Sequence, residues 1–221
     1  TECRRQRQMC IRDRSNISMK HLILIRHGQS EWNQQKRFTG WVDVGLTDKG
    51  RAEAKKAGEL IKEKKIKLDS FYSSYQKRAN DTLKIVMKEL NEDENLITKK
   101  WQLNERHYGE LTGLNKEDMK KKYGEEKIHQ FRRSWDVKPG ALDRKSPYHP
   151  LNIETYKDIP VSDIPDTESL KDTHKRVVDC YNELILKDLQ NGKGVCISAH
   201  GNSLRALCKL SLIHISEPTR H

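Results

Sequence analysis

Two histidines occupy equivalent places in this sequence. His27 follows the apolar run 22–25, His200 follows the apolar run 195–197, and a glycine comes directly after each histidine. Short apolar runs bounded by polar residues are typical of strands buried in a parallel sheet. Ligands of open α/β sheets bind outside the carboxyl ends of the strands. The spacing therefore predicts one site at which two imidazole groups meet.

Paired imidazoles could bind a metal, take part in hydrolysis with a serine, or carry a phosphoryl group. The zinc spacings H-E-x-x-H and H-x-x-E-H are missing from the sequence, and no cysteine clusters with a histidine, so we expect no metal. The nucleophile elbow G-x-S-x-G of serine hydrolases is missing as well.

Phosphoryl chemistry fits the neighbouring residues best. Planar guanidinium groups match phosphate oxygens in pairs, and four arginines are candidates for this contact: Arg26, Arg78, Arg132 and Arg133. Walker A and G-x-G-x-x-G loops are both missing, so a glycine-cradled nucleotide is not the expected ligand.

Four motifs surround these residues: LILIRHGQSEWN at 22–33, FTGW at 38–41, LNERHYG at 103–109 and AHGNSLRAL at 199–207. In order and spacing they resemble the motifs of the cofactor-dependent phosphoglycerate mutases, which belong to the histidine phosphatase superfamily. The resemblance covers roughly residues 20–210. The Arg-His-Gly motif alone indicates only the superfamily, whereas the second and third motifs together favour the mutase branch.

The resemblance implies a role for each matching residue. His27 is the implied nucleophile that becomes a phosphohistidine, and Glu105 is the implied proton donor and acceptor. Arg26, Arg78 and His200 are expected to hold the transferring phosphoryl group. Eleven more residues are implied in substrate binding: Ser30, Asn33, Thr39, Gly40, Arg106, Tyr108, Lys116, Arg132, Arg133, Gly201 and Asn202.

The implied reaction interconverts 3-phosphoglycerate and 2-phosphoglycerate in glycolysis and gluconeogenesis, with 2,3-bisphosphoglycerate as the primer and no metal. A bisphosphoglycerate synthase and a phosphatase of the same superfamily are the alternatives. Gly40 matches the mutase pattern rather than that of the synthase. Gln29 departs from the acidic residue that many members carry there, a change that we expect to be mild.

The chain has 221 residues and a formal net charge of +11. A small phosphorylated substrate accounts for that charge, and lysines interspersed with glutamates in 49–65 favour a solvated helix over a nucleic-acid surface. No apolar stretch approaches the length of a membrane span. The five cysteines form no C-x-x-C pair, which favours the reducing cytoplasm. We further expect that neither nucleic acid nor a membrane is a partner. The family resemblance alone implies association into homo-oligomers.

The elements that must position these residues alternate between strands and helices. Strands are predicted at 22–25, 71–73, 96–103 and 195–197, and helices at 47–64, with Thr47 as N-cap, 75–90, 115–123, 126–134, 167–190 and 203–210. This alternation predicts a three-layer α/β/α fold around a mostly parallel open sheet. Residues 109–166 are expected to form a helical and loop insertion over the site.

The two ends do not follow these patterns. Residues 1–18 show neither period, and residues 211–221 break the preceding helical pattern; both contain segments that resemble translated adaptor sequence. We therefore expect a non-native or disordered leader at 1–18, a single domain at 19–210 and a non-native tail at 211–221. On this interpretation the domain is C-terminally truncated, and its natural parent continues past Leu210.

Overall fold

The computed structural model of the chain describes residues 21–215. The predicted leader, 1–18, and the last six residues of the predicted tail lie outside the described residues. Side chains are described as far as residue 209.

Four parallel strands form the sheet at the centre of the molecule, in the order β1-β4-β2-β3. Their bounds are Leu22–Arg26 for β1, Ser70–Ser73 for β2, Ile97–Lys99 for β3 and Val195–Ala199 for β4. Strand β4 lies between β1 and β2, and Arg26 pairs with Ala199 at the carboxyl end. Because these strands end level with each other, the residues that follow them emerge side by side.

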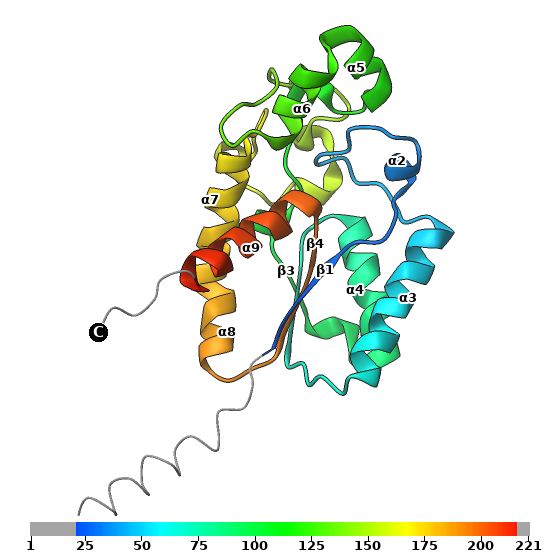
Figure 1. The fold of residues 1–221 in the computed structure, drawn as a ribbon, viewed down its shortest axis with the longest axis vertical. Coiled ribbons are helices and arrows are strands. Elements are labelled where there is room, and N and C mark those ends of the chain that lie inside the picture. Colours follow the sequence, from blue (N-terminus) through cyan, green and yellow to red (C-terminus); the bar gives the residue numbers. More distant parts are fainter. Residues whose placement is uncertain (1–20, 216–221) are drawn as a thin grey trace, which may run out of the picture.

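Helices cover both faces of this sheet (Figure 1). One face carries α3, Asp48–Glu63, and α4, Lys77–Leu90. The other carries α7, Leu170–Cys180, a π-helical segment, Tyr181–Ile185, α8, Leu186–Gln190, and α9, Gly201–Ile215. The predicted three-layer α/β/α fold with a parallel sheet is therefore confirmed.

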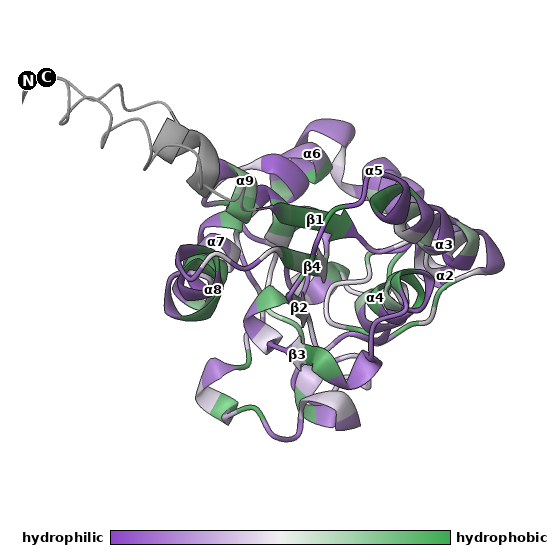
Figure 2. Cartoon of the chain, turned by 90° about the horizontal axis from the view of Figure 1, so that it is seen from below, coloured by the Kyte–Doolittle hydropathy of each residue, from purple (hydrophilic) through white to green (hydrophobic). Residues whose placement is uncertain are grey.

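The alternation of side chains along β4 explains the two cores. Val195, Ile197 and Ala199 point into the cluster with α7 and α9, whereas Cys196 points into the cluster with α3 and α4. All five residues of β4 are buried, because helices cover both of its faces and a strand lies on either side. Figure 2 shows the resulting band of hydrophobic strands between helices with hydrophilic outer faces.

Two further helices, α5 (Lys116–Tyr123) and α6 (Glu125–Arg133), lie beyond the carboxyl ends of the strands (Figure 1). The short helix α2, Glu31–Gln34, lies at the same end. Short 3₁₀ helices complete the connections, at Glu94–Leu96, Trp101–Leu103, Gly109–Leu111, Pro150–Asn152, Glu154–Tyr156 and Val161–Asp163. Residues 134–169 otherwise form no helix or strand.

Local sequence signals account for the helix starts. The Thr47 hydroxyl accepts a hydrogen bond from the Gly50 amide at 3.1 Å, so the predicted N-cap of α3 is confirmed. Ser169 and Asp172 form a capping box at the start of α7. A capping box satisfies two amides that would otherwise lack partners, which explains why this helix begins at Leu170 rather than at 167.

The structure also differs from the predicted elements elsewhere. The helix predicted for 167–190 is interrupted by the π-helical segment Tyr181–Ile185. The third strand covers only 97–99, and a 3₁₀ helix at 101–103 replaces its predicted second half. The helix predicted for 203–210 begins at Gly201 and continues to Ile215, past the expected break. Strand β1 is only partly buried at 22–24, since it lies at the edge of the four described strands rather than inside the sheet.

Candidate active site

The two predicted imidazoles meet at the carboxyl edge of the sheet. The His27 amide donates to the Ala199 carbonyl at 3.0 Å, which extends the β1–β4 ladder to the first histidine. The ring centroids of His27 and His200 lie 5.0 Å apart at an angle of 56°. Tertiary pairing of two strands separated by about 170 positions thus creates the juxtaposition that the motif spacing predicts.

A cavity of about 170 Å³ opens above this pair. Thirteen of the sixteen predicted site residues line it, and Arg205 joins them. The predicted lining residues are Arg26, His27, Asn33, Thr39, Gly40, Arg78, Glu105, Tyr108, Lys116, Arg132, Arg133, Gly201 and Asn202.

His27 is held in one tautomer. Its Nδ1 lies 2.7 Å from the Gly28 carbonyl oxygen, which can only accept, so Nδ1 carries the proton and Nε2 carries the lone pair. Burial, reinforced by the nearby Arg78 guanidinium, lowers the pKa of His27 to about 3. The ring is therefore neutral at physiological pH, which is the form that a nucleophile requires.

His200 is fully buried behind the cavity wall. Its Nε2 lies 2.8 Å from the Ser74 hydroxyl, and burial, followed by the charge of Arg78, lowers its pKa well below the usual value. Its Nδ1 has no hydrogen-bond partner among the described residues. Buried ring nitrogens are rarely left without a partner, so this atom is suited to a ligand group placed beside the rings.

Arg78 is buried to 1% exposure on α4. Its two amino groups donate to the carbonyls of Val42 and Gly40, both at 2.9 Å. Burial lowers its pKa, and no carboxylate forms a salt bridge with it in the described part of the chain. A buried cation without a salt-bridge partner favours an anionic ligand.

Glu105 presents one carboxylate oxygen to protein donors. Oε1 accepts from the Arg106 amide at 2.8 Å, from the Asn202 amide at 3.3 Å and from Asn202 Nδ2 at 2.9 Å. Oε2 lies on the side of Gly201, where a Cβ atom would be 4.0 Å from it. The carboxylate is thus anchored through Oε1, and Oε2 is the oxygen available for the proton transfer that the sequence resemblance implies.

A buried ion pair holds the segment that carries Glu105. Arg176 donates to both oxygens of Glu168 at 2.7 and 2.9 Å and to the carbonyls of residues 102, 104 and 105. Glu168 also accepts from the His107 amide at 2.8 Å. Sequence reasoning missed this pair; the signal was an arginine beside Val177 on the apolar face of an amphipathic helix.

Three predicted site residues do not line the cavity. Ser30 is fully buried and caps α2, and its hydroxyl accepts from the Asn33 amide at 3.3 Å. Arg106 is fully buried, donates to the Phe131 carbonyl and stacks over Tyr108. His200, as described above, reaches the site from behind the wall.

The two glycines of the His-Gly motifs serve different purposes. A Cβ atom at Gly28 would be 2.2 Å from the Gly50 carbonyl oxygen, so the close approach of α3 requires glycine there. At Gly201 the nearest atoms to a Cβ, in Arg26 and Glu105, are 4.0 Å away and line the cavity.

Cations line the wall formed by α5, α6 and α9. Burial and the neighbouring Arg132 lower the pKa of Lys116, and its ammonium lies 5.8 Å from the Phe38 ring centroid. Partial burial, then Arg205 and Arg132, lower the pKa of Arg133. Sequence reasoning missed Arg205, although its i+3 spacing from Asn202 on a helix indicates a shared face.

Within residues 21–215, no group of three or more His, Cys, Asp or Glu side chains could hold a metal ion. Among the same residues, no helix has the length and apolar character needed to cross a bilayer.

The chain is similar to known proteins in both sequence and fold. Residues 22–149 match the family described as the histidine phosphatase superfamily, branch 1. A mycobacterial glucosyl-3-phosphoglycerate phosphatase solved in complex with VO3 has a TM-score of 0.66 and 21% identity, over 88% of this chain and 81% of that one. At that identity the likeness concerns the fold.

Two curated proteins are much more similar in sequence, and both are named 2,3-bisphosphoglycerate-dependent phosphoglycerate mutase. The protein from Pelagibacter ubique is 65% identical over 191 residues, 86% of this chain and 80% of the relative. The protein from Borreliella burgdorferi is 50% identical over 86% of this chain and 77% of the relative. The chain therefore belongs to the 2,3-bisphosphoglycerate-dependent phosphoglycerate mutases within the histidine phosphatase superfamily.

Proposed function

We propose that this protein interconverts 3-phosphoglycerate and 2-phosphoglycerate through a phosphohistidine at His27. The observation that carries the proposal is a neutral imidazole, with its Nδ1 proton bound to Gly28, at the base of a cationic cavity that also contains Glu105. A neutral nucleophile beside arginines suits attack on phosphorus, because the guanidinium groups stabilise the charge of the equatorial oxygens.

His27 Nε2 is the proposed attacking atom. As its bond to phosphorus forms, the bond from phosphorus to the departing oxygen breaks; in the reverse direction a substrate hydroxyl attacks and the electron pair returns to Nε2. Arg26 and Arg78 stabilise the phosphoryl oxygens, and His200 Nδ1 contacts one of them. The missing partner of that nitrogen and the 5.0 Å spacing of the rings support this assignment.

Glu105 is the proposed proton carrier. Oε2 takes the proton from the attacking hydroxyl and returns it to the departing oxygen, while Oε1 keeps its three donors. The anchored geometry holds the carboxylate in register with the substrate, which is the main requirement of general acid–base catalysis.

The residues present also fit the primer that the family name implies. The cavity offers Arg26 and Arg78 beside His27, and Lys116, Arg132 and Arg133 on another wall, which suits a ligand with two phosphates and a carboxylate. When bound, 2,3-bisphosphoglycerate supplies the phosphoryl group that loads His27. The proposed partners are thus phosphorylated glycerates, and the proposed compartment is the cytoplasm, where glycolytic substrates occur.

One assay tests this function against its alternatives. The protein is incubated with 3-phosphoglycerate and trace 2,3-bisphosphoglycerate, and 2-phosphoglycerate, 2,3-bisphosphoglycerate and free phosphate are measured. Formation of 2-phosphoglycerate that depends on the primer supports the proposal. Free phosphate alone indicates a phosphatase. In a parallel incubation that supplies 1,3-bisphosphoglycerate as phosphoryl donor, net accumulation of 2,3-bisphosphoglycerate without 2-phosphoglycerate indicates a synthase; either result overturns the proposal.

The variant His27→Ala tests the covalent route. We expect its turnover to fall to background and transfer of labelled phosphate to the protein to disappear, since no other group replaces the nucleophile. His129→Ala is the matched control, because His129 is exposed on α6 and does not line the cavity. Turnover that survives in the His27 variant would exclude the phosphohistidine.

A further inference from the structure

Arg205 lies on the cavity wall in the second turn of α9. Its Nη1 donates to Asn202 Oδ1 at 3.3 Å, and Nδ2 of the same amide donates to Glu105 and to the Tyr108 hydroxyl. The guanidinium therefore lies one hydrogen bond away from a contact of Glu105. Since a guanidinium has five N–H donors, this bond leaves several for a ligand.

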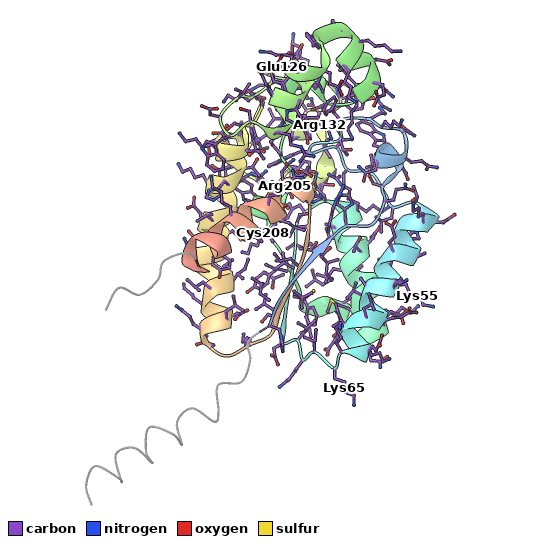
Figure 3. The ribbon with its side chains drawn as sticks, viewed as in Figure 1. Lys55, Lys65, Glu126, Arg132, Arg205 and Cys208 are labelled. Carbon is purple, nitrogen blue, oxygen red and sulfur yellow. The ribbon has the colours of Figure 1, made fainter. Side chains whose placement is uncertain are left out.

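The surroundings of Arg205 are cationic. Arg205, Arg132 and Arg133 line the same cavity, and after partial burial Arg205 and Arg132 both lower the pKa of Arg133. Figure 3 shows Arg132 on α6 and Arg205 on α9 at the same end of the molecule. Among the described residues, no salt bridge pairs any of the three arginines with a carboxylate.

An anion bound between these three guanidinium groups would offset the repulsion that Arg205 and Arg132 exert on Arg133. A phosphoglycerate carries a carboxylate as well as a phosphate, so it has a second anionic group that these arginines could bind. In the proposed function the transferring phosphoryl group is held by His27, Arg26 and Arg78. The other anionic group of the substrate therefore needs a different set of cations.

We propose that Arg205 is a specificity-determining substrate-binding residue, which contacts the anionic end of the phosphoglycerate that lies away from His27. The assignment rests on the proposed function, because that function names the ligand. The contact requires the charge and the reach of the guanidinium. A residue that only positioned Asn202 would need neither the full charge nor a donor beyond Nη1.

The test compares Arg205→Gln and Arg205→Lys with the unsubstituted protein. For Arg205→Gln we expect the KM for 3-phosphoglycerate to rise about tenfold to a hundredfold, the effect of losing a charged hydrogen bond. We expect kcat to change much less, and Arg205→Lys to restore part of the affinity. A fall in kcat with an unchanged KM would overturn the inference and assign Arg205 to the positioning of Asn202.

Lys209→Gln is the matched control. It removes the same charge one turn further along α9, where the ammonium lies 3.5 Å from the Trp135 ring centroid and outside the lining of the catalytic cavity. We expect its KM to stay within about twofold of the unsubstituted protein, as for a surface substitution. An equal loss in both glutamine variants would reduce the effect to net charge and contradict the specific contact.

Direct binding separates this inference from the proposed function. Calorimetric titration with 3-phosphoglycerate measures the affinity of each variant whether or not the protein turns the ligand over. A protein that binds it without mutase turnover would contradict the function alone, and the Arg205→Gln affinity would still decide the inference. Equal affinity in that variant, or a protein that does not bind 3-phosphoglycerate, would overturn the role of Arg205.

Discussion

At the scale of single residues, the site works by keeping its histidines neutral and its arginines charged. Burial disfavours any charge, but an imidazole loses its proton far more readily than a guanidinium does. Burial and Arg78 together bring the pKa of His27 to about 3. The same burial that keeps His27 in the neutral form of the proposed nucleophile thus leaves Arg78 as a charged group suited to binding an anion.

The two oxygens of Glu105 lead to a prediction at this scale. Glu105→Gln keeps an oxygen that can accept the three hydrogen bonds now made to Oε1, but the amide cannot take up a proton. We expect kcat to fall about 10²- to 10⁴-fold, the usual contribution of a proton-transfer group. The KM for 3-phosphoglycerate should change little, and steady-state kinetics check both values. A large rise in KM with unchanged kcat would show that Glu105 binds rather than catalyses.

At the scale of elements, helix α7 positions the segment that carries Glu105, although no residue of α7 lines the cavity. Arg176 reaches from α7 to three carbonyls of the 102–105 segment, and Glu168 fixes the guanidinium from the residue before its N-cap. The buried Arg176 side chain therefore fixes the position of the loop that carries Glu105, Arg106 and Tyr108. Both members of the pair are at most 9% exposed, so solvent does not screen it.

Replacing only Arg176 is predicted to lower the free energy of unfolding more than replacing both Arg176 and Glu168. Arg176→Leu leaves the Glu168 charge buried and unpaired, which typically destabilises a protein by about 3–5 kcal/mol. The double variant with Glu168→Leu should recover part of that loss, although the three carbonyls remain without their donor. Urea unfolding measures both. Arg51→Leu, exposed on α3, is the control, and a loss in Arg176→Leu as small as in the control would rule out the clamp.

At the scale of the whole molecule, stability is coupled to pH through the buried histidines. Burial lowers the pKa of His27 to about 3 and that of His107 to about 4, against an ordinary value of 6.5. Both rings are therefore neutral in the fold, whereas the unfolded chain takes up their protons below pH 6.5. The stability that these rings contribute is fully present above pH 6.5 and is lost as the pH falls toward 4.

Urea unfolding between pH 7.5 and 4.5 checks this dependence. We expect the free energy of unfolding to decrease with falling pH across that window. His107→Asn should weaken the dependence, because its amide oxygen can replace Nδ1 as acceptor for the Gly109 amide without titrating. His129→Asn removes an exposed histidine and should leave the slope unchanged. A stability that stays constant from pH 6.5 to 4.5 would contradict the prediction.

Local sequence determined the elements of this fold and the parts of its site that carry motifs. Apolar runs at 22–25 and 195–197 marked two strands, Thr47 marked a helix start, and the residues after each strand marked the site. These signals are local, because strand periodicity, capping and strand-end glycines depend on neighbours within a few positions.

Tertiary structure alone decided the order of the strands and the tautomer and pKa of His27. It also decided which oxygen of Glu105 accepts hydrogen bonds from the protein, and where Arg176 and Arg205 lie. It decided the close contact of Gly28 with α3 as well. The physical reason is shared by all of them. Burial, hydrogen-bond partners and electrostatic neighbours come from residues far apart in the chain, and no local pattern records which distant groups will surround a side chain.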